Sequence, residues 1–297
     1  MNRRRFLSAA GAFAVVLNGP EFAAAAQSEK AHHALRRKVV KVADNFPGAI
    51  GVFARTLAPG NPLVAYRAFE SFPTASIIKV LIMTTAYVLD ELHPGSLDQH
   101  VKFHRSELIA GSDFMHDATD GETFTVRQLI VPMIQVSDNT AANMLIGHFG
   151  IHTINGVALQ AGMNQTHLQR KFLDWYAIVR HSENVSTPAD MAHLLYLIET
   201  GAHEGIKTIV SPAHCRTMID VMLGQTDRDA IPAALPEGTP IANKTGEIEG
   251  TRNDVAIVNP YGASPWILTV MTKAAYDYSA SYAAIHEIAR AVAKTRA

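Results

Sequence analysis

A serine and a lysine stand three positions apart in the segment Ser76-Ile77-Ile78-Lys79, the only Ser-x-x-Lys in the chain. On a helix this spacing puts both side chains on one face, one turn apart. A serine hydroxyl is a poor nucleophile until a base takes its proton, and a lysine can act as that base only where its surroundings favour the neutral amine. The pair therefore indicates nucleophilic catalysis, although by itself it is equally typical of an ordinary helix surface.

A second segment, Ser137-Asp138-Asn139, lies between two helical patterns, so we expect a loop held by helices. A hydroxyl and a carboxamide in such a loop can pass on a proton and bind a substrate amide. The same residue types also cap the N-termini of helices, which is the simpler interpretation when this segment is taken alone.

A third segment, Lys244-Thr245-Gly246, closes a run of β-type residues. Gly246 has no side chain, so the backbone of a ligand can approach a strand edge closely there. Lys244 and Thr245 can bind a carboxylate. The backbone N–H of Glu247 can join that of Ser76 to stabilise an oxyanion. A strand that simply runs into a turn is the alternative.

The three segments follow one another at distances of 61 and 107 residues. Ser-x-x-Lys, Ser-Asp-Asn and Lys-Thr-Gly in this order are typical of class A β-lactamases and penicillin-binding proteins. Over nearly the whole chain after residue 26, the sequence resembles the class A β-lactamase-like serine hydrolases. Gly250-Thr251-Arg252, just after the third segment, fits the same family.

The resemblance implies a role for each matching position. Ser76 would form an acyl-enzyme after Lys79 takes its proton, directly or through water. Ser137 would pass that proton to the leaving nitrogen with the help of Lys244. The backbone N–H groups of Ser76 and Glu247 would form the oxyanion hole. Four further residues would hold the substrate: Asn139 at the acyl side-chain amide, Gly246 at a close backbone approach, and Thr245 and Arg252 at the carboxylate.

One position departs from the family pattern. Class A β-lactamases carry a glutamate ahead of a Thr-x-Pro-like segment, and this glutamate activates the water that releases the acyl group. Counting back from Pro188 places Lys171 at that position. Asp174 is the nearest acid, but its spacing differs. This pattern resembles class A-like hydrolases that lack the glutamate, so we expect slow deacylation, and Lys171 and Asp174 mark the region where a base would have to be found.

The resemblance implies a hydrolase that opens β-lactams, with a D,D-peptidase or penicillin-binding protein of slow deacylation as the second hypothesis. A non-catalytic sensor of β-lactams or peptidoglycan is the third. The expected partner is a small β-lactam or a peptidoglycan stem peptide, and no cofactor is expected. His100 and His104 have the spacing of half a metal site. No third ligand is apparent, so we expect no metal.

The elements that must position these residues follow from periodicity. β-type runs at 48–56 and 63–68, and again at 240–245, 254–258 and 266–272, predict a five-stranded antiparallel sheet. Helical patterns at 28–45 and 279–293 would flank it. An all-helical domain, with patterns at 77–92, 126–135, 140–148, 190–199 and 215–222, would be inserted between the second and third strands. The fold class is therefore α/β (α+β), with an α/β part at 27–72 plus 226–297 and a helical part at 73–225.

Composition excludes other classes of protein. The net charge of −1 gives no field that would attract nucleic acid or an anionic membrane. Cys215 is the single cysteine, so no internal disulfide can form. Residues 1–26 read as a signal peptide, in which Arg3-Arg4-x-Phe6-Leu7 resembles a twin-arginine motif and a general secretory signal is the alternative. We expect an exported, periplasmic monomer with no membrane span after removal of the signal.

Overall fold

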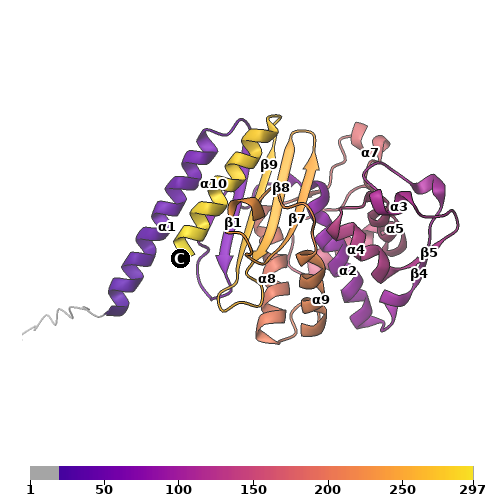
Figure 1. Ribbon diagram of the computed structural model, residues 1–297, viewed down its shortest axis with the longest axis horizontal. Coiled ribbons are helices and arrows are strands. Elements are labelled where there is room, and N and C mark those ends of the chain that lie inside the picture. The colour runs from indigo at the N-terminus through magenta and orange to yellow at the C-terminus, as the bar shows by residue number, and fades with distance from the viewer. Residues whose placement is uncertain (1–19, 297) are drawn as a thin grey trace, which may run out of the picture.

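The computed structural model describes residues 20–296, so residues 1–19, most of the predicted signal peptide, lie outside the described part. A central sheet separates two groups of helices (Figure 1). Helices α1 (Pro20–Asp44) and α10 (Tyr278–Arg296) lie side by side on one face of it. The other helices lie toward the opposite face and beyond its β7 edge. Within residues 20–296, no helix is both long enough and apolar enough to cross a bilayer.

The sheet has five strands in the order β2-β1-β9-β8-β7, and every neighbouring pair is antiparallel. The strands are β1 (Ala49–Thr56), β2 (Val64–Tyr66), β7 (Ile241–Ile248), β8 (Thr251–Val258) and β9 (Trp266–Lys273). The predicted five-stranded antiparallel sheet between terminal helices is confirmed. Because β7 is an edge strand, its outer side is open to the helical part of the molecule.

The helical part carries the remaining helices. The longer ones are α2 (Lys79–Leu92), α4 (Val126–Gln135), α5 (Asn139–Phe149), α6 (Ile151–Gln160), α8 (Pro188–Glu204) and α9 (Pro212–Leu223). Single turns of this part are α3 (Asp113–His116), α7 (Trp175–Val179) and the 3₁₀ turns η1 (Ala75–Ile78), η2 (Ser96–Asp98) and η3 (Arg105–Glu107). A further 3₁₀ turn, η4 (Pro232–Ala234), lies outside it and packs against α10. The predicted helices are all present. The largest differences are that α1 begins eight residues before the expected start at 28 and that α8 ends five residues after the expected end at 199.

This part is not purely helical. Strand β4 (His100–Lys102) pairs with β5 (Thr123–Thr125), and β3 (Phe72–Pro73) pairs with β6 (Val185–Ser186). Runs of two or three residues are too short for a two-residue periodicity to be recognised, which is why the sequence predicted neither pair. The β3–β6 pair matters for function because it lies directly before the Ser76 turn and joins it to the segment around residue 184.

Two hydrophobic cores hold the layers together, and β1 contributes to both. Ile50, Val52 and Ala54 pack with α1 and α10, whereas Ala49 and Phe53 pack against the core of the helical part. This alternation follows from the two-residue repeat of a strand. The sheet is therefore buried on both faces, which gives β7 a rigid support.

Glu199, on α8, is an exception within the core of the helical part. Its side chain is fully buried, and neither carboxylate oxygen has a hydrogen-bond partner among the described residues. Burial raises its pKa from 4.5 to about 7. The folded state thus binds this proton more tightly than the unfolded chain, so the free energy of unfolding falls as the pH rises from 4.5 to 7.

Glu199→Leu is therefore expected to raise the free energy of unfolding at pH 8 by about 3 kcal/mol, and by less at pH 4. Urea unfolding at the two pH values measures the difference. Glu204→Leu, at the exposed end of the same helix, is the matched control and should show no such pH dependence. An equal gain at both pH values in Glu199→Leu would contradict the account of this carboxyl.

Candidate active site

The three motif segments meet in one cleft between the helical part and the edge strand β7. The larger part of the cleft has a volume of about 470 Å³, and the smaller part has about 300 Å³. Ser76, Asn139 and Glu247 line both parts. Residues from three distant stretches of the sequence therefore share one solvent-accessible space.

Ser76 lies in the 3₁₀ turn η1, immediately before α2. Ala75 before it has a φ of +46°, a left-handed conformation that a residue with a side chain adopts only when its surroundings impose it. Two asparagines hold this turn. Asn253 Nδ2 donates to the Thr74 carbonyl at 3.2 Å, and the Thr74 N–H and hydroxyl both donate to the Asn184 carbonyl. The serine is thus presented to the cleft on a strained and well-braced turn.

Lys79 begins α2 and is fully buried behind the serine. Its Nζ donates to the carbonyl of Ser137 at 2.7 Å, to Ser137 Oγ at 3.1 Å and to Asn139 Oδ1 at 2.8 Å. Burial, and secondly the charge of Lys244, lower the pKa of Lys79 well below its ordinary value of 10.5. A neutral amine is therefore accessible to Lys79, as a general base requires.

The Ser-Asp-Asn segment serves both of the purposes considered from the sequence. Asp138 is the N-cap of α5, where its carboxylate accepts from the Ala141 N–H at 2.8 Å. Its other oxygen accepts from the Met115 N–H. Ser137 has a φ of +57°, and this bend turns its hydroxyl toward the cleft. The cap thus fixes the loop, and the residues on either side of Asp138 reach Lys79.

Lys244 and Gly246 bring β7 against this group. The buried Lys244 Nζ donates to Ser137 Oγ at 3.0 Å and to the Thr245 carbonyl at 2.8 Å. A Cβ on Gly246 would come within 2.7 Å of the Thr74 carbonyl oxygen, so glycine is needed for β7 to pack beside the Ser76 turn. Burial lowers the pKa of Lys244 to about 8. Ser137 Oγ therefore lies between two buried amines.

The structure does not bring Arg252 into the cleft, and its side chain lines neither part. The guanidinium lies 3.6 Å from the centre of the Tyr278 ring and donates to the carbonyls of Ile248 and Thr251. Its Nε is 3.2 Å from a carboxylate oxygen of Glu247. Arg252 thus stabilises the β7–β8 turn from the side of the sheet that faces α10.

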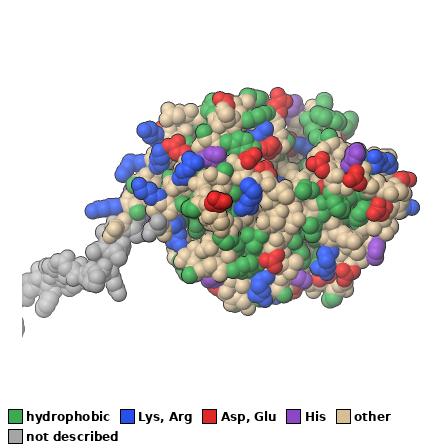
Figure 2. Space-filling view, in the orientation of Figure 1, with side chains coloured by type: hydrophobic (Ala, Val, Ile, Leu, Met, Phe, Trp, Pro, Cys, Tyr) green, Lys and Arg blue, Asp and Glu red, His purple; other side chains and the backbone are tan. Residues whose placement is uncertain are grey.

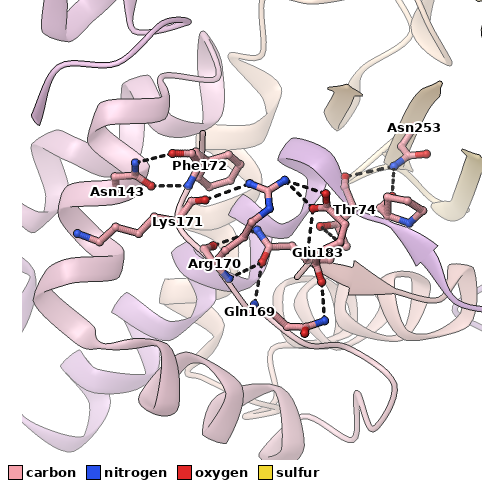
Figure 3. Close-up of polar contacts among 10 residues, drawn as sticks. Thr74, Asn143, Gln169, Arg170, Lys171, Phe172, Glu183 and Asn253 are labelled. Carbon is pink, nitrogen blue, oxygen red and sulfur yellow. Dashed lines mark hydrogen bonds and ion pairs between the residues drawn. The ribbon is translucent and has the colours of Figure 1, made fainter. Parts of the chain in front are cut away.

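In the segment where a deacylating base was expected, Phe172 rather than Lys171 turns its side chain toward Lys79. Asn143 holds the Phe172 backbone at both polar atoms, accepting from its N–H at 2.7 Å and donating to its carbonyl at 3.0 Å. The ring lies 4.4 Å from Lys79 Nζ. The Lys171 side chain points away (Figure 3), toward Gly147 on α5. Asp174 accepts from the Ala177 N–H as the N-cap of α7.

A salt bridge and an asparagine hold the two ends of the segment that carries Phe172 together, because they join residues 169–170 to residues 183–184. The Arg170 guanidinium donates to both carboxylate oxygens of Glu183, at 2.7 and 2.8 Å. Asn184 Oδ1 accepts from the N–H groups of Gln169 and Arg170. Figure 3 shows the pair of Arg170 and Glu183 beside the Phe172 segment. The sequence analysis did not identify Asn143, Phe172, the Arg170–Glu183 salt bridge or the Asn184 contacts as parts of the site. Asn143 was detectable, because it lies one helical turn after Asn139 and shares its face.

Within 20–296, no three His, Cys, Asp or Glu side chains gather as a metal site would require. His104 Nδ1 lies 4.0 Å from Asp120, and both side chains are largely exposed.

A five-stranded antiparallel sheet with a serine, a second hydroxyl and two buried lysines at its edge defines a serine hydrolase of the acyl-transfer type. A family model described as the Beta-lactamase enzyme family matches residues 34–295. The chain belongs to this family, and it is a class A β-lactamase-like serine hydrolase.

Individual relatives agree with this assignment. The carbapenem-hydrolyzing beta-lactamase KPC of Klebsiella oxytoca is 30% identical over 240 residues, 79% of each chain. Beta-lactamase SME-1 of Serratia marcescens is 29% identical over 281 residues, covering 91% of this chain and 90% of that protein. The solved structure of a beta-lactamase from Burkholderia phymatum superposes with a TM-score of 0.79 at 27% identity, over 90% of this chain and 99% of that one. These relatives favour a β-lactam hydrolase over a D,D-peptidase or a non-catalytic sensor.

Proposed function

We propose that the chain opens β-lactam amides through an acyl-enzyme on Ser76. The observation that carries the proposal is the place of Ser137 Oγ, 3.1 Å from Lys79 Nζ and 3.0 Å from Lys244 Nζ, in the wall of the cleft that Ser76 also lines. A proton can move from the nucleophile to a leaving nitrogen along this path without entering bulk water. The test is covalent labelling by a fluorescent penicillin, which must depend on Ser76.

Acylation follows from the contacts in the cleft. As an ammonium, Lys79 has three N–H donors, and all three are used in the hydrogen bonds to Ser137 and Asn139. As a neutral amine it has two donors and a lone pair, which takes the Ser76 proton while the serine oxygen bonds to the carbonyl carbon. The amide C–N bond then breaks. Its nitrogen takes a proton from Ser137 Oγ, which regains one from Lys79. The backbone N–H groups of Ser76 and Glu247 would stabilise the oxyanion.

Substrate orientation would come from Asn139 and β7. Asn139 Nδ2 donates one hydrogen to the Ala110 carbonyl at 2.9 Å, and its second hydrogen is suited to the carbonyl of an acyl side chain. Thr245 lines the smaller part of the cleft, with the Lys244 ammonium behind it. We assign the substrate carboxylate to this pair, with the backbone of Gly246 in close approach, and Arg252 supports the turn beyond.

Deacylation is the slow step of this proposal. A water that attacks the acyl-enzyme needs a base within hydrogen-bond reach. Phe172 presents a hydrocarbon ring where such a base would be held, and the carboxylates of Asp174 and Glu183 are engaged in a helix cap and a salt bridge. The acyl-enzyme is therefore expected to persist. The export predicted from residues 1–26 would place this chemistry in the periplasm.

The pH dependence of acylation follows from Lys244. Below its pKa of about 8 the side chain is an ammonium, which attracts a carboxylate and donates to Ser137. Above that pH it becomes neutral, so the second-order rate of acylation is expected to fall as pH rises through 8. Stopped-flow acylation between pH 6 and 10 measures this. Lys244→Arg should move the decline to higher pH, and a wild-type rate that stays constant up to pH 10 would contradict the assignment.

A further inference from the structure

The two parts of the cleft must receive opposite ends of the substrate. Ser137, the proposed proton donor to the leaving nitrogen, lines only the smaller part, as does Thr245. The leaving nitrogen and the carboxylate on the carbon next to it therefore lie there. The acyl group, on the other side of the carbonyl carbon, must extend into the larger part of about 470 Å³.

Part of the lining of this larger part is apolar. Leu173, Trp175 and Ile178, around α7, line it from one side, and Ile248 of β7 lines it from the other. The Trp175 side chain is 68% exposed, so its ring is available to a ligand. Hydrophobic side chains gather over α7 at the upper right of Figure 2. An acyl group with an apolar body would cover this surface.

The charges of the larger part do not cancel. Arg170 and Glu183 neutralise each other, and Glu247 is paired with Arg252. Glu249 lines the same space, is exposed, and has no ion pair or side-chain hydrogen bond to another residue in the described part of the chain. It precedes Gly250, whose φ of +70° shapes the β7–β8 turn. One uncompensated carboxylate thus lines the larger part together with the apolar side chains, directly after Ile248.

We infer that this subsite selects acyl groups that have an apolar body and end in a primary ammonium, with Glu249 as the specificity-determining residue. The inference rests on the proposed function, because it needs an acyl group attached to Ser76. An ammonium on a β-lactam side chain and one on a peptide side chain have the same chemistry. The same contacts would therefore bind the ammonium group of a peptide substrate.

The test compares two penicillins of equal size that differ in one charge: benzylpenicillin with a para-aminomethyl group and benzylpenicillin with a para-ethyl group. The second-order rate of Ser76 acylation is measured for each at low salt. The wild type is expected to prefer the ammonium compound by about two- to fivefold, the range of an exposed ion pair. The preference should shrink in 1 M salt, because the charges are then screened.

Two variants locate the preference. Glu249→Gln should bring the ratio of the two rates close to one. Glu237→Gln removes the same charge from an exposed position before the opposite end of β7 and should keep the wild-type ratio. Trp175→Ala should slow acylation by both compounds to a similar degree.

The outcomes separate the inference from the function on which it rests. Equal rates for the two penicillins in the wild type, or an unchanged preference in Glu249→Gln, would overturn the inference while leaving the acyl-enzyme in place. No acylation by either compound would overturn the proposed function itself. Two peptide thioesters, one with a lysine and one with a norleucine side chain, test whether the subsite also selects ammonium groups on peptides. A faster acylation by the lysine compound extends the inference to peptides, and equal rates restrict it to β-lactams.

Discussion

Ser76→Ala is expected to abolish covalent labelling by a fluorescent penicillin and to lower β-lactam opening by on the order of 10⁵-fold, because loss of the nucleophile removes the acyl-enzyme route itself. The alanine removes a single oxygen from a half-buried side chain, so the turn held by Asn253 and Asn184 should remain. Labelling is read on a denaturing gel, and circular dichroism checks the fold.

Ser71→Ala is the matched control for this experiment. Ser71 is exposed, precedes β3 and donates no side-chain hydrogen bond among the described residues. Its substitution should leave labelling as in the wild type. Undiminished labelling of Ser76→Ala would show that another residue is the nucleophile, and the proposed proton path through Ser137 would then have no starting point.

Phe172→Glu is expected to accelerate deacylation by about 10² to 10⁴-fold, the usual contribution of a positioned general base. The Asn143 contacts are made with the backbone of residue 172, so they survive the substitution and hold the new carboxylate in the place of the ring. That carboxylate would lie near Lys79 and facing the cleft. Stopped-flow absorbance with a chromogenic cephalosporin measures the change as a loss of the initial burst and a faster steady state.

Phe172→Gln separates catalysis by an acid from simple opening of space. Glutamine has nearly the same shape as glutamate but cannot take a proton from water at neutral pH. It should therefore keep the slow steady state of the wild type. Equal acceleration by both variants would indicate that the ring acts only by excluding water. Rapid deacylation by the wild type would contradict the account of the Phe172 segment altogether.

The sheet and the longer helices were predictable because their signals repeat along the sequence. The alternating burial of Ile50, Val52 and Ala54 follows the two-residue repeat that indicated β1. The start of α8 at Pro188, capped by Thr187, lies close to where the pattern predicted it. The order of the three motif segments also indicated their convergence, which the contacts around Ser137 now describe.

Other features depend on contacts that no local pattern contains. The orientation of Phe172 depends on Asn143 of α5, which holds its backbone from 29 residues away, so counting along the loop could not show which side chain faces Lys79. The guanidinium of Arg252 packs on the ring of Tyr278 at the start of α10, a contact between residues 26 positions apart that no short motif indicates. The β3–β6 pair depends on two residues from each strand.

The central claim is that Ser76 carries a β-lactam-derived acyl group that is released slowly, and time-resolved mass spectrometry of the intact protein after addition of a penicillin tests it most directly. The account predicts that an adduct of the full mass of the penicillin forms quickly, maps to the peptide that contains Ser76 and decays over many times the acylation half-life. Hydrolysis of the penicillin by the wild type without any adduct on that peptide would contradict it.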